Sequence, residues 1–246
     1  MQHSQLIEKI TQLGFQGFKE AYMRQMEDIS YDALGFQDRL YQLLDAQSIF
    51  LKNKQIAMSR KLSKIKDKQA AIEAIDFKAD RQLDKSVLHS LAALNFIRSH
   101  HNIIITGKTG TGKSYIAQAM ANRAIMDGFR VYYVRTPSLL EEIRIARIDG
   151  TYTSLIKKYS RFQLLILDDF GVSPMHGDDA TNLFEIIEDR TEINSTIITS
   201  QLPVSDWYNY LNNNTVADAI LDRVVHSSHR IELKGESMRK LKSSLN

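Results

Sequence analysis

Apolar residues recur along the chain with two different spacings. In the N-terminal part they lie three or four positions apart, as at Leu6, Ile10 and Leu13, which is the period of one helix face. Further along, short runs of β-branched and aliphatic residues interrupt the helical spacing. These runs predict five strands, at Ile103 to Thr106, Val131 to Val134, Leu164 to Leu167, Thr196 to Thr199 and Ile231 to Leu233.

The segments between these runs carry helical patterns. One amphipathic helix is predicted from Ser86 to Ile97 and another from Tyr115 to Met126, before Gly128. Apolar strands separated by helices predict an α/β fold with a five-stranded parallel sheet covered on both faces. We expect a small all-α domain over residues 1–80 and the α/β domain over residues 81–246.

A glycine-rich loop follows the first predicted strand. The sequence from Asn102 to Ser114, NIIITGKTGTGKS, matches the phosphate-loop motif G-x-x-x-x-G-K-[ST] at every defined position. Glycines let successive backbone N–H groups turn toward an anion, and the following helix directs its positive dipole end at the same phosphates. We expect Lys113 to contact the β and γ phosphates and the Ser114 hydroxyl to bind Mg²⁺. The predicted nucleotide-binding residues are Gly107, Lys108, Thr109, Gly110, Thr111, Gly112, Lys113, Ser114 and Tyr115.

Two carboxylates end the third predicted strand. Asp168 and Asp169 follow directly after Leu167, at the C-terminal end of the strand, where ligands bind in open α/β sheets. We expect Asp168 to hold Mg²⁺ together with Ser114, and Asp169 to orient or polarise the attacking water. An acidic strand end alone is more often a helix cap or a turn, but its combination with the upstream phosphate loop favours nucleotide hydrolysis. No Asn-Lys-x-Asp motif for guanine is present, which favours ATP over GTP.

Composition narrows the class of protein without deciding it. Of the 246 residues, 43% are hydrophobic and 25% are charged, which is typical of an ordinary globular protein. No cysteine occurs, so disulfides and thiolate metal sites are excluded. We expect a cytoplasmic protein with no membrane partner, because the N-terminus lacks a secretion pattern and no run of eighteen apolar residues occurs.

Basic residues are concentrated between Lys52 and Lys68. The net charge of +3 permits a nucleic-acid partner but does not require one. Two interpretations of the cluster stay open: a solvated helix face, or a helix that lies along DNA phosphates. Under the second interpretation the DNA-binding residues are Lys52, Lys54, Arg60, Lys61 and Lys64.

At this point the chain resembles the AAA+ ATPases, within them the DnaC-like branch, and more closely the IstB-type helper proteins of bacterial insertion sequences. The resemblance rests on GKTGTGKS, LLILDDFG, ITSQLPVSDW and ADAILDRVVHSSHRIELKGESMRK, and on the segment from LYQLLDAQ to IDFKADRQLD. It implies a P-loop NTPase domain with a reduced or absent helical lid, which agrees with the few residues after Leu233.

The resemblance also implies roles for individual residues. Gln201 matches the sensor-1 position, where an amide holds the catalytic water or the γ-phosphate. Arg223 matches the arginine finger, which would act on a neighbouring subunit, and Arg239 matches sensor 2. Each arginine could instead form a surface ion pair, and Arg230 competes for either role. Asp169 departs from the usual Asp-Glu pair.

In this branch the segment after the second strand faces the channel of an oligomer. Here it carries basic residues, namely Arg144, Arg147, Lys157 and Lys158, which would follow a DNA backbone; a salt-bridged surface helix is the alternative. The resemblance implies an ATP- and Mg²⁺-dependent homo-oligomer that binds double-stranded DNA and assists a cognate transposase. The alternatives are a DnaC-like replicative helicase loader and a small-molecule kinase with the same phosphate loop.

Overall fold

The apolar runs form one parallel sheet in the computed structural model, which describes residues 3–238 and 240. All five predicted strands are confirmed, and the strand order is β2-β3-β4-β1-β5, with every neighbouring pair parallel. The central runs are buried along almost their whole length because helices cover both faces of the sheet, whereas the edge strand β5 has exposed polar residues, among them Glu232. The strands are β1 (Asn102–Gly107), β2 (Val131–Arg135), β3 (Leu164–Phe170), β4 (Ser195–Ser200) and β5 (Ser228–Leu233).

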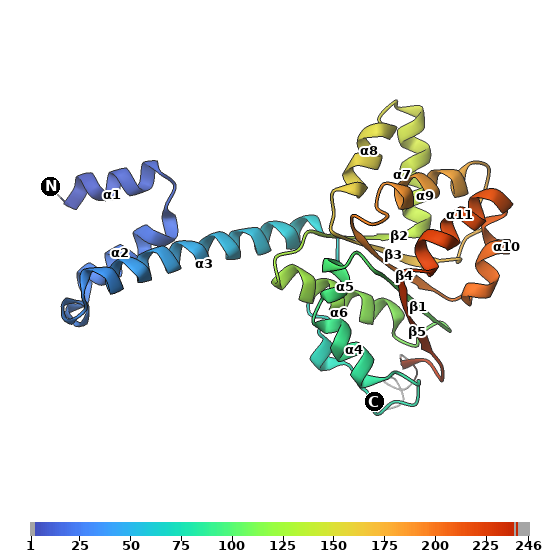
Figure 1. Cartoon of the computed structure of the whole chain (residues 1–246), viewed down its shortest axis with the longest axis horizontal. Coiled ribbons are helices and arrows are strands. Elements are labelled where there is room, and N and C mark those ends of the chain that lie inside the picture. The colour runs from blue at the N-terminus through green and yellow to red at the C-terminus, as the bar shows by residue number, and fades with distance from the viewer. Residues whose placement is uncertain (1–2, 239, 241–246) are drawn as a thin grey trace. The chain divides into compact units, whose positions relative to one another are not determined.

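Helices cover the two faces of the sheet (Figure 1). One face packs into a core with α7, α8, α9, α10 and α11, to which the strands contribute Ile104, Leu165 and Ile198. The other face is covered by α6, most of whose residues are buried. The helices are α6 (Lys113–Met126), α7 (Thr136–Ile148), α8 (Tyr152–Ser160), α9 (Asp179–Glu188), η3 (Val204–Asp206), α10 (Trp207–Leu211) and α11 (Asn214–Val225).

The single helix predicted from Ser86 to Ile97 is wrong. The chain forms α4 (Lys85–Ala92) and a short α5 (Asn95–Arg98), separated by a left-handed residue, Leu94. Leu94 has φ of 61° and is 1% exposed, so burial of its side chain outweighs the cost of a left-handed leucine. Apolar spacing continues across this break, and the sequence pattern therefore does not reveal it.

The segment that precedes α4 is held on α6 by two amide side chains. The Gln118 carbonyl oxygen accepts hydrogen bonds from the backbone N–H groups of Lys66 and Asp67, and the Asn122 amide donates to the carbonyls of Asp67 and Ala70. Accordingly the chain divides into compact units at residues 1–58 and 59–246, with η2 (Ile72–Ala74) in the second. The boundary that the sequence predicts at residue 80 therefore lies later than this division. The segment between α3 and α4, called the linker below, has no regular apolar spacing that would assign it to either unit.

The N-terminal unit is helical, as the spacing predicts. It contains α1 (His3–Gln12), α2 (Gln16–Glu27), η1 (Ile29–Ala33) and most of α3 (Phe36–Leu62). α2 packs directly on α3, since a Cβ atom at Gly17 would lie 2.6 Å from the carbonyl oxygen of Ala46. No helix within residues 3–238 and 240 is long and apolar enough to cross a membrane, the 27-residue α3 included.

Candidate functional site

The phosphate-loop motif lies between the C-terminal end of β1 and the first turn of α6. Two of its glycines, Gly110 and Gly112, have φ of 84° and 100°, a region that costs other residues free energy. A Cβ atom at Gly112 would also lie 2.6 Å from Nη1 of Arg81, so a side chain here would displace that guanidinium. The motif therefore adopts the tight loop that it predicts, with the helix N-terminus at its end.

The side chain of Lys113 lies across this loop. Its Nζ donates hydrogen bonds to the carbonyls of Gly107, at 2.7 Å, and Lys108, at 2.8 Å. Burial lowers the pKa of the Lys113 ammonium from its ordinary value, and the charges of Asp168 and Asp169 act in the opposite direction. A desolvated ammonium ion with only carbonyl acceptors gains more from an approaching phosphate than an exposed lysine does.

Asp168 lies beside Ser114, as the motifs predict. The Ser114 hydroxyl donates to Oδ1 of Asp168 over 2.8 Å, and the Thr199 hydroxyl donates to the same oxygen. Tyr133 of β2 donates its phenolic hydroxyl to Oδ2, and the Asp168 side chain is almost completely buried. A hydroxyl and a carboxylate oxygen at this separation are hard ligands that suit Mg²⁺. Ser114 and Asp168 are thus the residues that would hold the ion.

Asp169 has an unusual backbone and a fixed side chain. Its φ is 58°, and it lies where the register between β3 and β4 shifts. Its Oδ2 accepts a hydrogen bond of 2.6 Å from Nε of Arg135, at the end of β2. A water molecule that gives a proton to Asp169 therefore competes with Arg135 for the carboxylate.

A cavity of about 390 Å³ lies over the loop. Its size falls within the range of pockets for small organic ligands. Gln201, which follows β4, accepts a hydrogen bond of 2.7 Å from the Thr109 hydroxyl, so this residue lies at the phosphate loop. The lining comes from the linker, the loop, α6, the ends of β3 and β4, and one residue after β5. The lining residues are Ala74, Ile75, Asp76, Arg81, Thr109, Gly110, Gly112, Lys113, Ser114, Tyr115, Gln118, Asp169, Gln201 and Met238.

Arg223 does not reach this cavity. Its backbone carbonyl accepts a hydrogen bond of 3.4 Å from the side-chain amide of Asn102, at the start of β1. The phosphate loop follows the other end of that strand. Its guanidinium binds both carboxylate oxygens of Glu188, donates to the Ala219 carbonyl, and lies 5.0 Å from the centre of the Phe184 ring. A phosphate held by the same chain is out of its reach.

The other two predicted arginines contribute less. Arg230 is exposed on β5, opposite Ile104, at mid-strand rather than at the loop. Arg239 lies outside the described residues. Its neighbour Met238 lines the cavity and donates its backbone N–H to the carbonyl of Gly110 over 2.9 Å.

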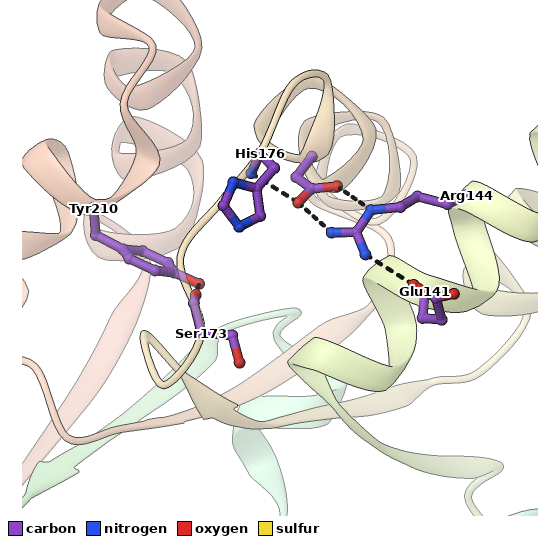
Figure 2. A network of polar contacts seen from close by, with 6 residues as sticks. Glu141, Arg144, Ser173, His176 and Tyr210 are labelled. Carbon is purple, nitrogen blue, oxygen red and sulfur yellow. Dashed lines mark hydrogen bonds and ion pairs between the residues drawn. The ribbon is translucent and has the colours of Figure 1, made fainter.

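Two of the predicted DNA-binding arginines are engaged within the fold. Arg144 donates to Glu141, as Figure 2 shows, and to both carboxylate oxygens of Asp179. The Asp179 carboxylate also accepts the backbone N–H of His176. Arg147 donates to the Asn182 side chain and lies over the Tyr152 ring, 3.9 Å from its centre. Both arginines thus join α7 to α9, and Arg147 also contacts α8, although both side chains stay partly exposed.

The remaining predicted DNA-binding residues are mostly exposed. Lys158 lies 3.4 Å from a Glu142 oxygen, whereas Lys157 has no ion pair among the described residues. Along α3 and just after it, the basic side chains also lack a carboxylate within 4.0 Å in the described part of the chain, and Arg60 donates to the Met126 sulfur. These exposed residues are Lys52, Lys54, Arg60, Lys61 and Lys64.

Four residues that the motifs do not predict belong to the site. Tyr133 and Thr199 donate to Asp168, Arg135 pairs with Asp169, and Arg81 lines the cavity and donates to the Thr111 carbonyl. Arg135 and Thr199 lie near strand C-terminal ends, a position that could have indicated them. No local signal marks the hydroxyl of Tyr133 or the linker residue Arg81.

The chain has relatives among known proteins of bacterial insertion sequences. The chain is 40% identical over 233 residues to an insertion sequence ATP-binding protein of Sinorhizobium fredii, with 95% of this chain and 94% of that protein covered. It is 36% identical over 199 residues to the ATP-binding protein of insertion sequence IS1162 of Pseudomonas fluorescens, covering 81% and 86%. These relatives match the chain across both of its compact units.

Solved structures share the fold at low sequence identity. The replication initiator DnaA bound to AMPPCP and single-stranded DNA has a TM-score of 0.59 at 19% identity, covering 74% of this chain and 56% of that chain. The DnaC helicase loader has a TM-score of 0.57 at 19% identity, covering 69% and 99%. The family model for IstB-like ATP binding proteins matches residues 8–246. With an AAA+ fold and a match over nearly its whole length, the chain belongs to the IstB-like ATP-binding protein family.

Proposed function

We propose that this chain is an ATPase that assembles on double-stranded DNA and helps a transposase choose its target. ATP and Mg²⁺ drive the assembly, and the proposed setting is the cytoplasm, where both meet DNA. The observation that carries the proposal is the arrangement of Lys113, Ser114 and Asp168 at one cavity, within a family whose relatives belong to insertion sequences.

The position of Arg223 supports action between subunits. Its backbone lies near the start of β1 and its guanidinium is bound to Glu188, whereas the phosphate loop follows the end of β1, so we expect it to act on nucleotide only when another copy presents one. An arginine supplied from a second subunit stabilises charge that develops on the γ-phosphate. ATP then joins protomers, and its hydrolysis separates them.

Within one subunit the side chains have separate tasks. Lys113 binds phosphate oxygens, Gln201 and Asp169 orient water, and Ser114 and Asp168 hold the metal ion. When bound, Mg²⁺ neutralises phosphate charge in the transition state. The exposed lysines of α3 support contact with the DNA backbone, which would be independent of sequence.

Replacement of Lys113 by Ala tests the nucleotide-dependent step. Loss of a charged hydrogen-bond donor is expected to weaken ATP binding by roughly 10- to 100-fold and to abolish ATP-dependent assembly. Light scattering with and without ATP, in the presence of duplex DNA, measures the assembly. The exposed residue Lys85 offers the matched control, because Lys85→Ala removes a charge from the same compact unit at a position that does not line the cavity. Unchanged assembly of the Lys113 variant would reject the mechanism.

A helicase loader is the second candidate, favoured by the similarity in fold to the DnaC helicase loader. The two functions differ in their nucleic acid. Target selection requires ATP-dependent assembly on duplex DNA, whereas a loader acts at single strands. Filter binding with matched single- and double-stranded oligonucleotides, together with a pull-down against a hexameric helicase, distinguishes them.

A further inference from the structure

Arg81 is a buried arginine in the wall of the nucleotide cavity. It follows η2 in the linker, and only 4% of its surface is exposed. Its backbone carbonyl accepts a hydrogen bond of 3.0 Å from the N–H of Lys234, the residue after β5. The backbone is therefore fixed between two segments, and the side chain extends to the phosphate loop.

The hydrogen bonds of its guanidinium are incomplete. Nη1 donates to the Thr111 carbonyl at 3.1 Å and Nη2 to the Asp76 carbonyl at 2.6 Å, but Nε is buried without an acceptor. Among residues 3–238 and 240, no carboxylate oxygen lies within 4.0 Å of the group. Arg81 thus has a buried positive charge without a paired anion.

Another buried arginine of this unit, Arg190, shows how the fold can satisfy an arginine without an anion. Arg190 also lacks a carboxylate, but its guanidinium donates to the carbonyls of Tyr159, Phe162 and Ser195 and to the Thr196 hydroxyl. Each of its three guanidinium nitrogens therefore has an acceptor within the fold, as expected for a structural residue. Arg81 differs in having a buried nitrogen without an acceptor and in lining a cavity.

The environment of Arg81 favours an anion. Burial lowers the pKa of its guanidinium, and the charge of Asp76 acts in the opposite direction without forming an ion pair. Lys113 lines the same cavity, and Nη1 of Arg81 lies against the loop, 2.6 Å from where a Cβ atom of residue 112 would be. Two desolvated cations at one phosphate loop attract a polyphosphate more strongly than either one alone.

We propose that Arg81 binds the phosphate groups of the nucleotide held by the loop, which serve as its counter-ion. This inference rests on the proposed ATP-binding function and adds a ligand that the phosphate-loop motif does not contain. The same side chain then links bound nucleotide to another residue of the linker within the second compact unit, through its hydrogen bond to the Asp76 carbonyl.

Calorimetric titration of the full chain with ATP, ADP and adenosine tests the proposal. Arg81→Met removes the charge and keeps a side chain of similar length. We expect it to weaken ATP and ADP binding by roughly 10- to 100-fold and to leave adenosine binding unchanged. Lys78→Met is the matched control, because it removes an exposed charge from the same linker and should bind all three ligands like the original chain.

The ratio of ATP to adenosine affinity separates phosphate binding from a structural role. Equal weakening of all three ligands, or no weakening at all, would overturn the proposal while leaving ATP binding by the original chain intact. If the original chain does not bind ATP, the proposed function fails as well. Should Arg81→Met not fold, Arg81→Gln decides: it removes the charge but keeps a hydrogen-bond donor for the neighbouring carbonyls, and an unchanged ratio of ATP to adenosine affinity in that variant contradicts a phosphate contact.

Discussion

At the scale of single residues, the carboxylate of Asp168 depends on its hydroxyl neighbours. Both of its oxygens accept hydrogen bonds, which come from Ser114, Thr199 and Tyr133. A metal ion bound by Ser114 and Asp168 would replace at least the hydrogen bond between these two residues. Tyr133 then remains to orient the carboxylate. Groups that orient a metal ligand influence metal affinity almost as much as the ligand does.

Tyr133→Phe is therefore expected to raise the Mg²⁺ concentration needed for half-maximal nucleotide binding, by about tenfold or more. The measurement is Mg²⁺ titration with a fluorescent ATP analogue. Tyr132→Phe is the control, since Tyr132 packs in the core on the opposite face of β2 and its ring contacts Tyr159. The same Mg²⁺ dependence in both variants would show that Tyr133 does not orient the metal ligand.

At the scale of elements, the contacts between α7 and α9 predict what the basic residues of α7 do. Arg144 bonds to both carboxylate oxygens of Asp179, whose side chain is 2% exposed. Without the arginine, a buried carboxylate loses its charged partner, at a cost of about 2 kcal/mol or more.

Arg144→Met should consequently lower the melting temperature by roughly 5 °C or more and leave the DNA affinity of the folded protein unchanged. Differential scanning calorimetry and DNA titration give the two values. Arg161→Met serves as a control, because Arg161 is exposed and has no ion pair within the described residues. A loss of DNA affinity without a loss of stability would assign Arg144 to the DNA interface instead.

The contact of α9 with α11 sets the expected behaviour of Arg223. Glu188 binds the guanidinium, and both side chains are partly exposed. Removal of the Arg223 side chain should therefore change the free energy of unfolding by at most about 1 kcal/mol. Arg223→Ala is expected to bind ATP normally and to lose hydrolysis in the assembly. A mixture of Arg223→Ala with Lys113→Ala protomers should recover part of the ATPase rate, because each supplies what the other lacks. Loss of ATP binding by Arg223→Ala alone would place the arginine at its own nucleotide.

Elements were predictable where their signal is local. The strand at Leu164 to Leu167 and the loop at Gly107 to Ser114 could be read directly, since apolar runs and glycine spacing are properties of neighbouring residues. The break at Leu94 and the roles of Arg81 and Tyr133 could not, because they depend on groups far away in the sequence. Basic residues were also indistinguishable by pattern: the partner of Arg144 lies on another helix.

At the scale of the whole molecule, the distribution of unpaired basic residues predicts where DNA binds. Lysines of α3 are exposed without carboxylate partners in the described structure, whereas the arginines of α7 are paired. Electrostatic contact with phosphates is available only to the first group without loss of internal ion pairs.

Replacement of Lys52, Lys54 and Lys61 by Gln should weaken duplex DNA binding and reduce the slope of log affinity against log salt concentration by about 0.9 for each DNA phosphate that is no longer neutralised. Fluorescence anisotropy at several salt concentrations measures the slope. ATP affinity is the internal control, since none of these lysines lines the nucleotide cavity. An unchanged slope would show that these lysines of α3 do not contact DNA phosphates, and Lys157 would then be the next residue to test.

The left-handed backbone at Asp169 bears on which acidic residue this position accepts. Aspartate and asparagine tolerate that conformation far better than most other residues with side chains, because a short polar group can bond to the adjacent chain. Glutamate would meet a penalty there before any question of reactivity arose. The shape of the polypeptide therefore favours the shorter acid at this position, independently of its reactivity.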